Sequence, residues 1–411
     1  MKKVFIQTYG CQMNIADSEE MFAHLSARGY LRTDNLDEAD AVLINTCTVR
    51  DHAEHKAVSF LGRLHAWKKE RAGRRIIFAG CAAERLGKAL QKKYPFLDIL
   101  SGAKGIEHFS DTLDKSGLFG PQTSQGETLP PGLTGYVTIM RGCNFACTYC
   151  IVPSVRGPVK CLPHEDILQE VRRKVSAGAK EIMLLGQTVN AYQDGAVSFG
   201  DLLNKAGEIP GVVRVGFTSP HPIYFTPQFL AAIKDNPKIA RHIHLPAQSG
   251  STKVLQEMKR GYTREILLEK IKALQAAGFV ISTDLIVGFP TETEEDFAQT
   301  LSLVDEAAFS TAYCYKYSPR QGTPAAQMKL HPQEILEQRL ENLLNKVRGL
   351  AEDAYRAQIG TTQEVLFETP DKGRSSGSFW VKAASAHPVG SVAKLTVEKA
   401  VGTLLIAREE L

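Results

Sequence analysis

Three cysteines stand close together in the stretch "RGCNFACTYC", at Cys143, Cys147 and Cys150. Their spacing, C-x3-C-x2-C, allows three thiolates to hold three irons of a cubane 4Fe-4S cluster, because soft thiolates are the ligands that iron–sulfur clusters take. A cubane has four irons, so this motif leaves one iron open for another ligand. The sequence therefore predicts a cluster with a free coordination position.

A zinc knuckle or chance clustering would also account for grouped cysteines. Structural zinc sites need four ligands, usually supplied as two pairs, and no second pair follows this motif. The motif comes just after a strand-like run that opens a region of alternating strands and helices. We therefore favour an iron–sulfur cluster over zinc.

Three further cysteines, Cys11, Cys47 and Cys81, are far apart in the chain, but each follows a strand-like run, at 4–8, 41–45 and 75–79. In a parallel sheet the carboxyl ends of these strands meet at one edge, where doubly wound folds bind ligands. A free buried thiol is the usual explanation for any one of them. Their equivalent positions predict a second three-thiolate cluster with an open iron.

Length and composition limit the number of domains, the partners and the cellular location that we expect. A chain of 411 residues is long enough for two or three domains, and its charge of +4 permits a nucleic-acid partner without requiring one. No signal-peptide pattern or membrane-length apolar run is present, so we expect a cytoplasmic protein that does not bind membranes. Structural disulfides are rare there, so the eight cysteines are expected in metal sites, redox chemistry or the core.

Pattern divides the chain into three domains and a linker. Strand–helix alternation predicts a doubly wound α/β domain over 1–116, and a Gly/Pro/Ser/Thr-rich stretch predicts a linker over 117–134. Six further strand–helix units predict an open, partial (β/α)6 barrel over 135–345. A short all-β tail over 346–411 predicts a small barrel of the oligonucleotide-binding type.

The expected strands of the partial barrel lie at 136–140, 181–185, 213–217, 242–245, 280–287 and 311–317. Those of the tail lie at 362–367, 379–382, 392–397 and 402–406.

With its C-x3-C-x2-C motif, the middle region resembles the radical S-adenosylmethionine (SAM) superfamily. The resemblance implies that the open iron binds the amino and carboxylate groups of SAM, whose reductive cleavage yields a 5′-deoxyadenosyl radical. It also implies that Tyr149 faces the adenine. No protein acid or base is expected, because hydrogen abstraction by a carbon radical needs none.

Polar residues at successive predicted strand ends of this region are candidates for binding SAM. Each one alone is also explained as a satisfied buried polar group or a helix cap. Amides suit the amino-acid end of the cofactor, a carboxylate suits ribose hydroxyls, and a guanidinium can pair with a carboxylate. The candidates are Gln187, Asn190, Gln248, Arg260 and Asp284.

Two cysteine sets and a β-rich tail together resemble the methylthiotransferase family, over essentially the whole chain. The resemblance implies two 4Fe-4S clusters, a sulfur-donating one in the N-terminal domain, and a C-terminal RNA-binding (TRAM) domain. The resemblance further implies that two SAM molecules are used per turnover and that C–H is converted to C–S–CH3. It also implies a sulfur source and an electron donor such as flavodoxin or ferredoxin; we expect a monomer.

Three motifs, "YGCQMN", "HLPAQSGS" and "YSPRQGTPAA", most resemble the branch that modifies C2 of N6-isopentenyladenosine at position 37, beside the tRNA anticodon. Sibling branches act on threonylcarbamoyl-adenosine in tRNA or on ribosomal protein S12. A non-catalytic, metal-stabilised RNA-binding protein is the alternative from another class. After the third motif cysteine, Arg156 and Gly157 match the branch, whereas Ser154, Val159, Cys161 and Leu162 depart from it.

Direct support for RNA binding in the residues is limited, because residues 351–411 are not basic overall. A local face with Lys372 and Arg374 beside Phe379 and Trp380 could contact phosphate and stack a base of an anticodon stem-loop. The predicted substrate contacts are Arg156, Arg320, Lys372 and Arg374. Cys161 and Cys314 have no partners in the pattern.

Overall fold

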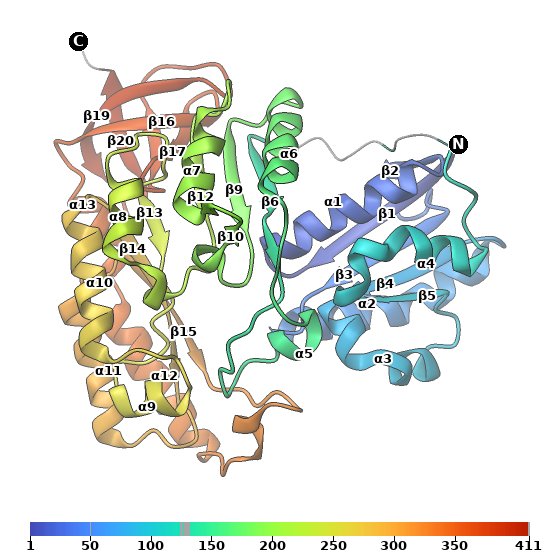
Figure 1. The fold of residues 1–411 in the computed structure, drawn as a ribbon, viewed down its shortest axis with the longest axis horizontal. Helices are drawn as coiled ribbons and strands as arrows, with labels where there is room; N and C mark the ends of the chain where they lie inside the picture. Colours follow the sequence, from blue (N-terminus) through green and yellow to red (C-terminus); the bar gives the residue numbers. More distant parts are fainter. Residues whose placement is uncertain (50, 124–125, 127–131, 410–411) are drawn as a thin grey trace. The chain divides into compact units, whose positions relative to one another are not determined.

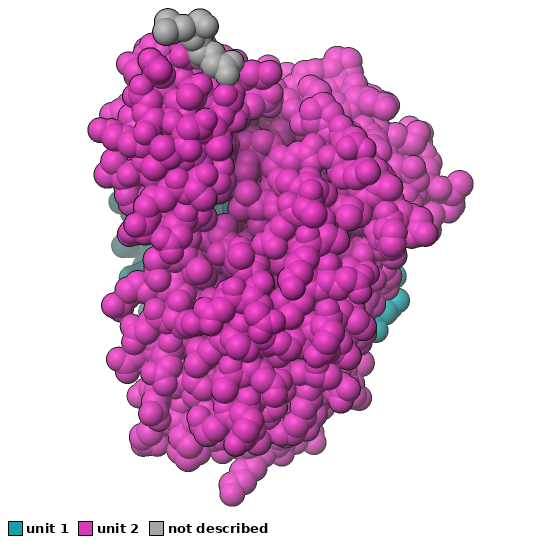
Figure 2. All heavy atoms as spheres, turned by 90° about the vertical axis from the view of Figure 1, so that its left-hand side faces the viewer, with its two compact units in different colours: residues 1–130, 141–145, 150–160 teal, residues 131–140, 146–149, 161–411 magenta. Residues whose placement is uncertain are grey.

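The computed structural model describes residues 1–49, 51–123, 126 and 132–409 (Figure 1). The chain divides into two compact units, coloured separately in Figure 2. Met1–Pro130, Arg141–Phe145 and Cys150–Lys160 form the first unit; Pro131–Met140, Ala146–Tyr149 and Cys161–Leu411 form the second. Much of the predicted linker, at 124–125 and 127–131, lies outside the described residues.

A five-stranded parallel sheet in the order β2-β1-β3-β4-β5 is the framework of the first unit. This strand order is typical of doubly wound folds and confirms the predicted fold class. Two of its strands, β2 and β5, were not predicted. The bounds are β1 (Lys2–Tyr9), β2 (Tyr30–Thr33), β3 (Ala41–Thr46), β4 (Arg75–Gly80) and β5 (Ile99–Gly102).

Helices bury both faces of this sheet. On β3, Val42 and Ile44 pack with residues of α2 and α3, whereas Ala41 and Leu43 pack with residues of α1 and α4. Successive strand residues point to opposite faces, so a strand covered on both sides reads as one continuous apolar run. The helices are α1 (Gln12–Ser26), α2 (Asp51–Glu70), α3 (Cys81–Lys93), the 3-10 helix η1 (Ala103–His108), α4 (Phe109–Ser116) and the short α5 (Val152–Arg156).

Six parallel strands form the partial barrel of the second unit, as two three-stranded groups, β6-β9-β12 and β13-β14-β15. A parallel bridge between Val215 and Ile239 continues the first group toward the second. All six were predicted, and β9 and β14 begin and end at the predicted residues. The bounds are β6 (Thr134–Thr138), β9 (Glu181–Leu185), β12 (Arg214–Phe217), β13 (His242–His244), β14 (Val280–Val287) and β15 (Thr311–Lys316).

Helices connect and cover these strands in the second unit (Figure 1). The main ones are α6 (His164–Ser176), α7 (Phe199–Glu208), α8 (Pro227–Lys234), α9 (Thr252–Glu257), α10 (Arg264–Ala276), α11 (Glu294–Ala307), α12 (Gln333–Val347) and α13 (Leu350–Arg356). The smaller elements are β7 (Met140–Arg141), β8 (Lys160–Cys161), β10 (Gln193–Asp194), β11 (Val197–Ser198), η2 (Val189–Ala191), η3 (Pro222–Tyr224) and η4 (Pro324–Gln327). Among the described residues, no helix is both long and apolar enough to cross a bilayer.

A closed five-stranded barrel, β16-β17-β18-β20-β19, ends the chain and confirms the predicted small barrel. Its core contains Phe367 and Phe379, and the Phe379 ring meets the Tyr355 ring edge-on at 4.9 Å. The backbone amide of Arg241 donates a hydrogen bond to the carbonyl of Ser376 (2.8 Å), which ties this barrel to the partial barrel. The strands are β16 (Thr362–Thr369), β17 (Lys372–Ser375), β18 (Trp380–Ala383), β19 (Val392–Ala400) and β20 (Leu405–Glu409).

Candidate functional site

Three thiols follow the ends of three adjacent strands in the first unit. Cys47 and Cys81 come directly after β3 and β4, and Cys11 follows β1 after one intervening residue; these strands are neighbours in the sheet. Cys11 immediately precedes α1, and Cys81 is the first residue of α3. Parallel register therefore brings the three cysteines to one edge of the sheet, as the sequence predicted.

Glycines before two of these cysteines permit close packing at this edge. A Cβ atom on Gly10 would lie 2.3 Å from Oδ1 of Asn14 and 2.9 Å from Cβ of Cys47. Gly80 has a φ of +90°, and its Cβ would lie 2.2 Å from Oδ1 of Asn45. Both distances are shorter than van der Waals contact, so any larger residue would displace the cysteine that follows.

The three thiols affect one another's pKa values. A hydrogen bond with Cys47 is the largest cause that lowers the pKa of the Cys11 thiol, to about 6. The same hydrogen bond is the main reason that the pKa of Cys47 is raised. Burial raises the pKa of Cys81, while the positive charge of Arg156 opposes that rise. One thiol of this set is therefore readily deprotonated, as metal ligation requires.

A buried ion-pair network, which sequence reasoning missed, lies beside these thiols. Asp17 on α1 is fully buried and accepts hydrogen bonds from Arg141 (2.6 Å, Oδ1) and Arg156 (2.8 Å, Oδ2). Arg141 also pairs with Glu20 at 2.6 Å. Burial alone would raise the pKa of the Asp17 carboxyl, but the two guanidinium groups hold it below its usual value. The partners are 124 and 139 residues apart, so no local motif marks the network.

No group of three His, Cys, Asp or Glu side chains in the described part of the chain lies close enough to ligate a single metal ion. A cubane makes a different demand, because each thiolate binds a different iron and the ligands surround the cluster. Three thiols at one sheet edge, one of them with a lowered pKa and a guanidinium at hand, fit such an anionic cluster.

The motif cysteines Cys143, Cys147 and Cys150 lie between β7 and α5, in a segment without helix or strand. In the first unit, the backbone amide of Cys143 donates to the carbonyl of Gly157 at 3.1 Å. In the second unit, the amide of Thr148 donates to the carbonyl of Met258 at 3.2 Å. Backbone hydrogen bonds therefore hold the segment that carries the three thiols, although this segment is neither helix nor strand.

Arg260, one of the predicted SAM residues, contacts a motif cysteine through its side chain. Its Nη1 donates to Sγ of Cys147 at 3.5 Å, and its Nε donates to the hydroxyl of Tyr262 at 3.1 Å. Only 7% of Arg260 is exposed, and Tyr149 packs in the neighbouring apolar cluster with Met258. Burial opposes the charge of Arg260, yet nearby groups, first among them Tyr149, raise its pKa.

The other predicted SAM residues occupy distinct environments in the partial barrel. Oε1 of Gln187 is buried without a hydrogen-bond partner among the described residues. Asn190, by contrast, uses both ends of its amide on the backbone of His221, at 2.8 and 2.9 Å. Oδ2 of Asp284 lies 3.1 Å from Nε2 of His244. Gln248 has a φ of +71° and is hydrogen-bonded through its backbone to Asp284 and Ile286.

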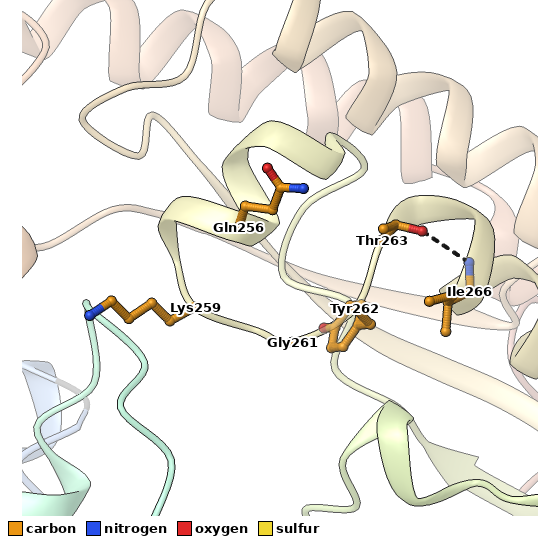
Figure 3. Close-up of a pocket in the computed structure, with 6 residues that line it drawn as sticks. All are labelled: Gln256, Lys259, Gly261, Tyr262, Thr263 and Ile266. Atoms are coloured by element: carbon orange, nitrogen blue, oxygen red, sulfur yellow. Dashed lines mark hydrogen bonds between the residues drawn. The ribbon is translucent and has the colours of Figure 1, made fainter.

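A surface hollow of about 460 Å³ lies next to Arg260, between α9 and α10 (Figure 3). The predicted SAM residues do not line it. The hydroxyl of Thr263, which caps α10, accepts from the amide of Ile266 at 3.4 Å, so this wall is a helix start. The lining residues are Gln256, Lys259, Gly261, Tyr262, Thr263 and Ile266.

The predicted substrate residues fall in separate places. Lys372 and Arg374 on β17 both lie over the ring of Trp380, with cation-to-centroid distances of 4.4 Å. Phe379 was expected on this face as well, but that prediction was wrong, because its ring is buried in the barrel core. Arg320 lies in the loop after β15, where its carbonyl accepts from Thr323.

Arg156 has a side chain that is only 5% exposed, and it is paired with Asp17. Of the two unassigned thiols, Cys161 ends β8 and Cys314 lies on β15, where burial raises its pKa to about 11.

Two family profiles match the chain: the radical SAM superfamily over 137–304, and Uncharacterized protein family UPF0004 over 3–102. Relatives named tRNA-2-methylthio-N(6)-dimethylallyladenosine synthase are similar over nearly the whole length. The Sorangium cellulosum protein is 38% identical over 95% of this chain and 88% of its own. The Nitratiruptor protein is 41% identical over 89% of this chain and 88% of its own.

Solved structures share the fold at low identity. Radical SAM methyltransferase TsrM from Kitasatospora setae has a TM-score of 0.59 and 11% identity, covering 79% of this chain and 77% of its own. Cobalamin-dependent radical SAM enzyme OxsB has a TM-score of 0.53 and 12% identity, covering 86% of this chain and 56% of its own.

Full-length similarity at this level places the chain in a family, and the C-x3-C-x2-C motif lies inside the matched radical SAM region. That superfamily uses SAM and a 4Fe-4S cluster. The chain therefore belongs to the radical SAM tRNA methylthiotransferase family, in the branch named tRNA-2-methylthio-N(6)-dimethylallyladenosine synthase, and is a transferase.

Proposed function

We propose that this protein converts C2–H of N6-isopentenyladenosine at position 37 of tRNA to C2–SCH3, using two SAM molecules per turnover. The observation that carries this proposal is about 40% identity, over nine-tenths of the chain, to relatives whose name states this product. The two sets of three cysteines supply what that chemistry needs. The clusters contribute electron transfer and the sulfur atom, and this chain contributes ligands, orientation and exclusion of water.

Cys143, Cys147 and Cys150 are proposed to hold the cluster that binds SAM, and Cys11, Cys47 and Cys81 the second cluster. Support for the second set comes from its position at three adjacent strand ends and from the mutual influence of its thiols. Lowering of the Cys11 pKa favours the thiolate, which is the form that ligates iron.

Around the first cluster, Tyr149, Gln187, Asn190, Gln248, Arg260 and Asp284 are the proposed SAM residues. Gln187 is the best placed to bind through its side chain, because its buried Oε1 makes no hydrogen bond in the described structure. Since Asn190 uses its amide on His221, its proposed contribution is to shape the loop. Arg260 would keep a positive charge beside the Cys147 thiolate.

Lys372, Arg374 and Trp380 are proposed to contact the anticodon stem-loop, with Arg320 as a further contact. Stacking on Trp380 and neutralisation of phosphate by the two cations are sequence-tolerant interactions. They would position the RNA without choosing the base. Choice of base would then be made at the partial barrel.

Iron and sulfide analysis after anaerobic reconstitution tests the cluster proposal. Two cubanes require about eight irons per chain; four irons, or zinc instead, would contradict it. Mass spectrometry of tRNA nucleosides from cells lacking the gene tests the substrate. We expect loss of 2-methylthio-N6-isopentenyladenosine with accumulation of its precursor.

An unchanged level of 2-methylthio-N6-isopentenyladenosine, with loss of the modification on ribosomal protein S12 or on threonylcarbamoyl-adenosine in tRNA, would assign the enzyme to a sibling branch. Absence of 5′-deoxyadenosine release under reducing conditions would favour the non-catalytic alternative. A reductant of the flavodoxin or ferredoxin type and a sulfur source are required for multiple turnovers.

A further inference from the structure

Arg156 is a buried cation with one guanidinium nitrogen that its carboxylate partner does not engage. Asp17 accepts hydrogen bonds from both guanidinium groups, and Arg141 is paired with Glu20 as well, so two arginines share two carboxylates in this network. Nη2 of Arg156 bonds Asp17, whereas its buried Nη1 has no hydrogen-bond partner among the described residues. Burying a cation is costly unless something nearby compensates its charge.

α5, which ends at Arg156, packs against α3, which begins at Cys81, so the arginine lies next to this set of thiols. The charge of Arg156 acts on Cys11 and on Cys81, in each case favouring the thiolate. Two neighbours of Arg156 in the chain, Ile151 and Val155, pack in an apolar cluster with Cys81. An apolar surrounding keeps water away and strengthens the effect of a nearby charge.

We propose that Arg156, held by Asp17, is a positioning residue that neutralises the cluster at Cys11, Cys47 and Cys81 and raises its reduction potential. This inference rests on the proposed second cluster. An added electron makes a thiolate-ligated cluster more negative, so an adjacent cation stabilises the reduced form more than the oxidised form. Hydrogen bonds to cluster sulfur and local charge are established determinants of such potentials.

The ion pair between Arg156 and Asp17 also connects the two cysteine sets within the first unit. Because Asp17 lies on the helix that Cys11 precedes, and Arg156 follows the C-x3-C-x2-C motif, one carboxylate links the supports of the two cysteine sets. This assignment differs from the RNA contact predicted from the sequence for Arg156. A purely structural ion pair would give the same geometry, so the test must read the cluster itself.

The experiment uses the full chain with Cys143, Cys147 and Cys150 changed to Ala, so that only the second site can load. After anaerobic reconstitution, iron and sulfide are counted, and the cluster is reduced by one electron with dithionite and mediators while its paramagnetic signal is followed. Arg156→Gln removes the charge and Arg156→Lys keeps it. Arg28→Gln is the matched control, because Arg28 is an equally buried arginine of the same unit paired with Asp114.

The parent is the chain with Cys143, Cys147 and Cys150 changed to Ala. We expect the cluster in Arg156→Gln to have a lower reduction potential than the cluster in the parent. The potential should stay close to the parent value in Arg156→Lys and equal it in Arg28→Gln. Failure of Arg156→Gln alone to retain iron, with a melting curve like the parent's, also supports the proposal. Equal potentials and equal iron in Arg156→Gln and the parent would overturn it.

If Arg156→Gln unfolds, the double variant Asp17→Asn/Arg156→Gln is compared with the single variant Asp17→Asn. The cluster in the double variant is expected to have the lower reduction potential of the two. Equal potentials in that pair count against the role of Arg156. If the parent itself takes up no iron, the second cluster is disproved, and that result is distinct from an unchanged potential in a loaded protein.

Discussion

Arg260 and Cys147 are 113 residues apart in the chain, yet Nη1 of the arginine donates a hydrogen bond to Sγ of the cysteine at 3.5 Å. The guanidinium also lies over the ring of Tyr262, with 5.4 Å between Cζ and the ring centroid. A fixed, permanently charged donor next to a thiolate stabilises the ionised ligand. The segment between α9 and α10 is thus part of the support for the cluster that we propose at Cys143, Cys147 and Cys150.

Replacing Arg260 by Gln should slow reductive cleavage of SAM about 10- to 100-fold, since a hydrogen bond to a charged group contributes about 1.5–3 kcal/mol. The rate of 5′-deoxyadenosine formation under anaerobic, reducing conditions measures the effect. Lys259→Gln, at the exposed neighbouring position, is the control and should match the parent. A normal rate in Arg260→Gln would show that the contact has no part in the chemistry.

Single cysteine substitutions should separate the two sites. Cys11→Ala is expected to abolish methylthiolation but to leave 5′-deoxyadenosine release largely intact, because Cys11 belongs to the second set. Cys147→Ala is expected to abolish both. Chromatography of SAM products and of tRNA nucleosides checks the two readouts, and an equal loss of cleavage in both variants would argue against separate roles.

Gly80→Ala should weaken the second site through packing alone. The added Cβ would meet Oδ1 of Asn45 at 2.2 Å and the carbonyl of Thr46 at 2.7 Å, at a φ of +90°. We expect a loss of about 1–3 kcal/mol in the free energy of unfolding and reduced iron uptake. Gly62→Ala on α2 is the matched control, because its Cβ would meet only the Tyr94 ring, at 3.8 Å or beyond; it should be neutral or slightly stabilising.

The cationic face of the C-terminal barrel should contribute to RNA affinity. Lys372→Gln and Arg374→Gln are each expected to weaken binding of an anticodon stem-loop and to reduce the salt dependence, by about one unit of slope for each phosphate that is no longer neutralised. Trp380→Ala should cost about 1–3 kcal/mol if a base stacks on it. Lys394→Gln on β19 is the control. Unaltered affinity and slope in all three face variants would place the RNA elsewhere.

Asp296 should make the partial barrel sensitive to acid. Burial opposes ionisation of its carboxyl, but Lys253 at 2.9 Å and Ser251 at 2.7 Å lower the pKa to about 2. A lowered pKa contributes stability above the unfolded value near 4, and that contribution is lost as the pH falls toward 2. Asp296→Asn should therefore cost about 2 kcal/mol at pH 7, with a difference that shrinks below pH 4.

Urea unfolding of the two proteins, followed by circular dichroism from pH 7 downward, measures this difference. The Asp296 side chain is only 6% exposed, but Lys253 is 51% exposed, so solvent screens their ion pair and about 2 kcal/mol is an upper value. A constant difference at every pH would attribute the effect to the lost helix cap rather than to charge.

Strongly apolar or alternating strands were predictable from the sequence, whereas some short strands with mixed composition were not. β14, an eight-residue strand with buried alternate residues, was predicted to the residue. β2 and β17 span only four residues each, which is too short for periodicity to distinguish them from loops.

The site was predictable where function depends on strand ends and unpredictable where it depends on tertiary pairing. Cys11, Cys47 and Cys81 could be grouped because parallel strands share an edge. The association of Asp17 with Arg141 and Arg156 has no counterpart in local spacing, so Arg156 was interpreted as a substrate contact. Phe379 was assigned to the surface because an aromatic next to Trp380 in a strand gives no sign of which one faces the core.

Two kinds of cysteine arrangement imply an order of maturation. The C-x3-C-x2-C ligands are present together as soon as that short segment leaves the ribosome. Cys11, Cys47 and Cys81 become neighbours only after β1, β3 and β4 have assembled. Under the proposed assignment, iron would reach the strand-end site only after these strands have folded together, whereas the short motif could be loaded earlier.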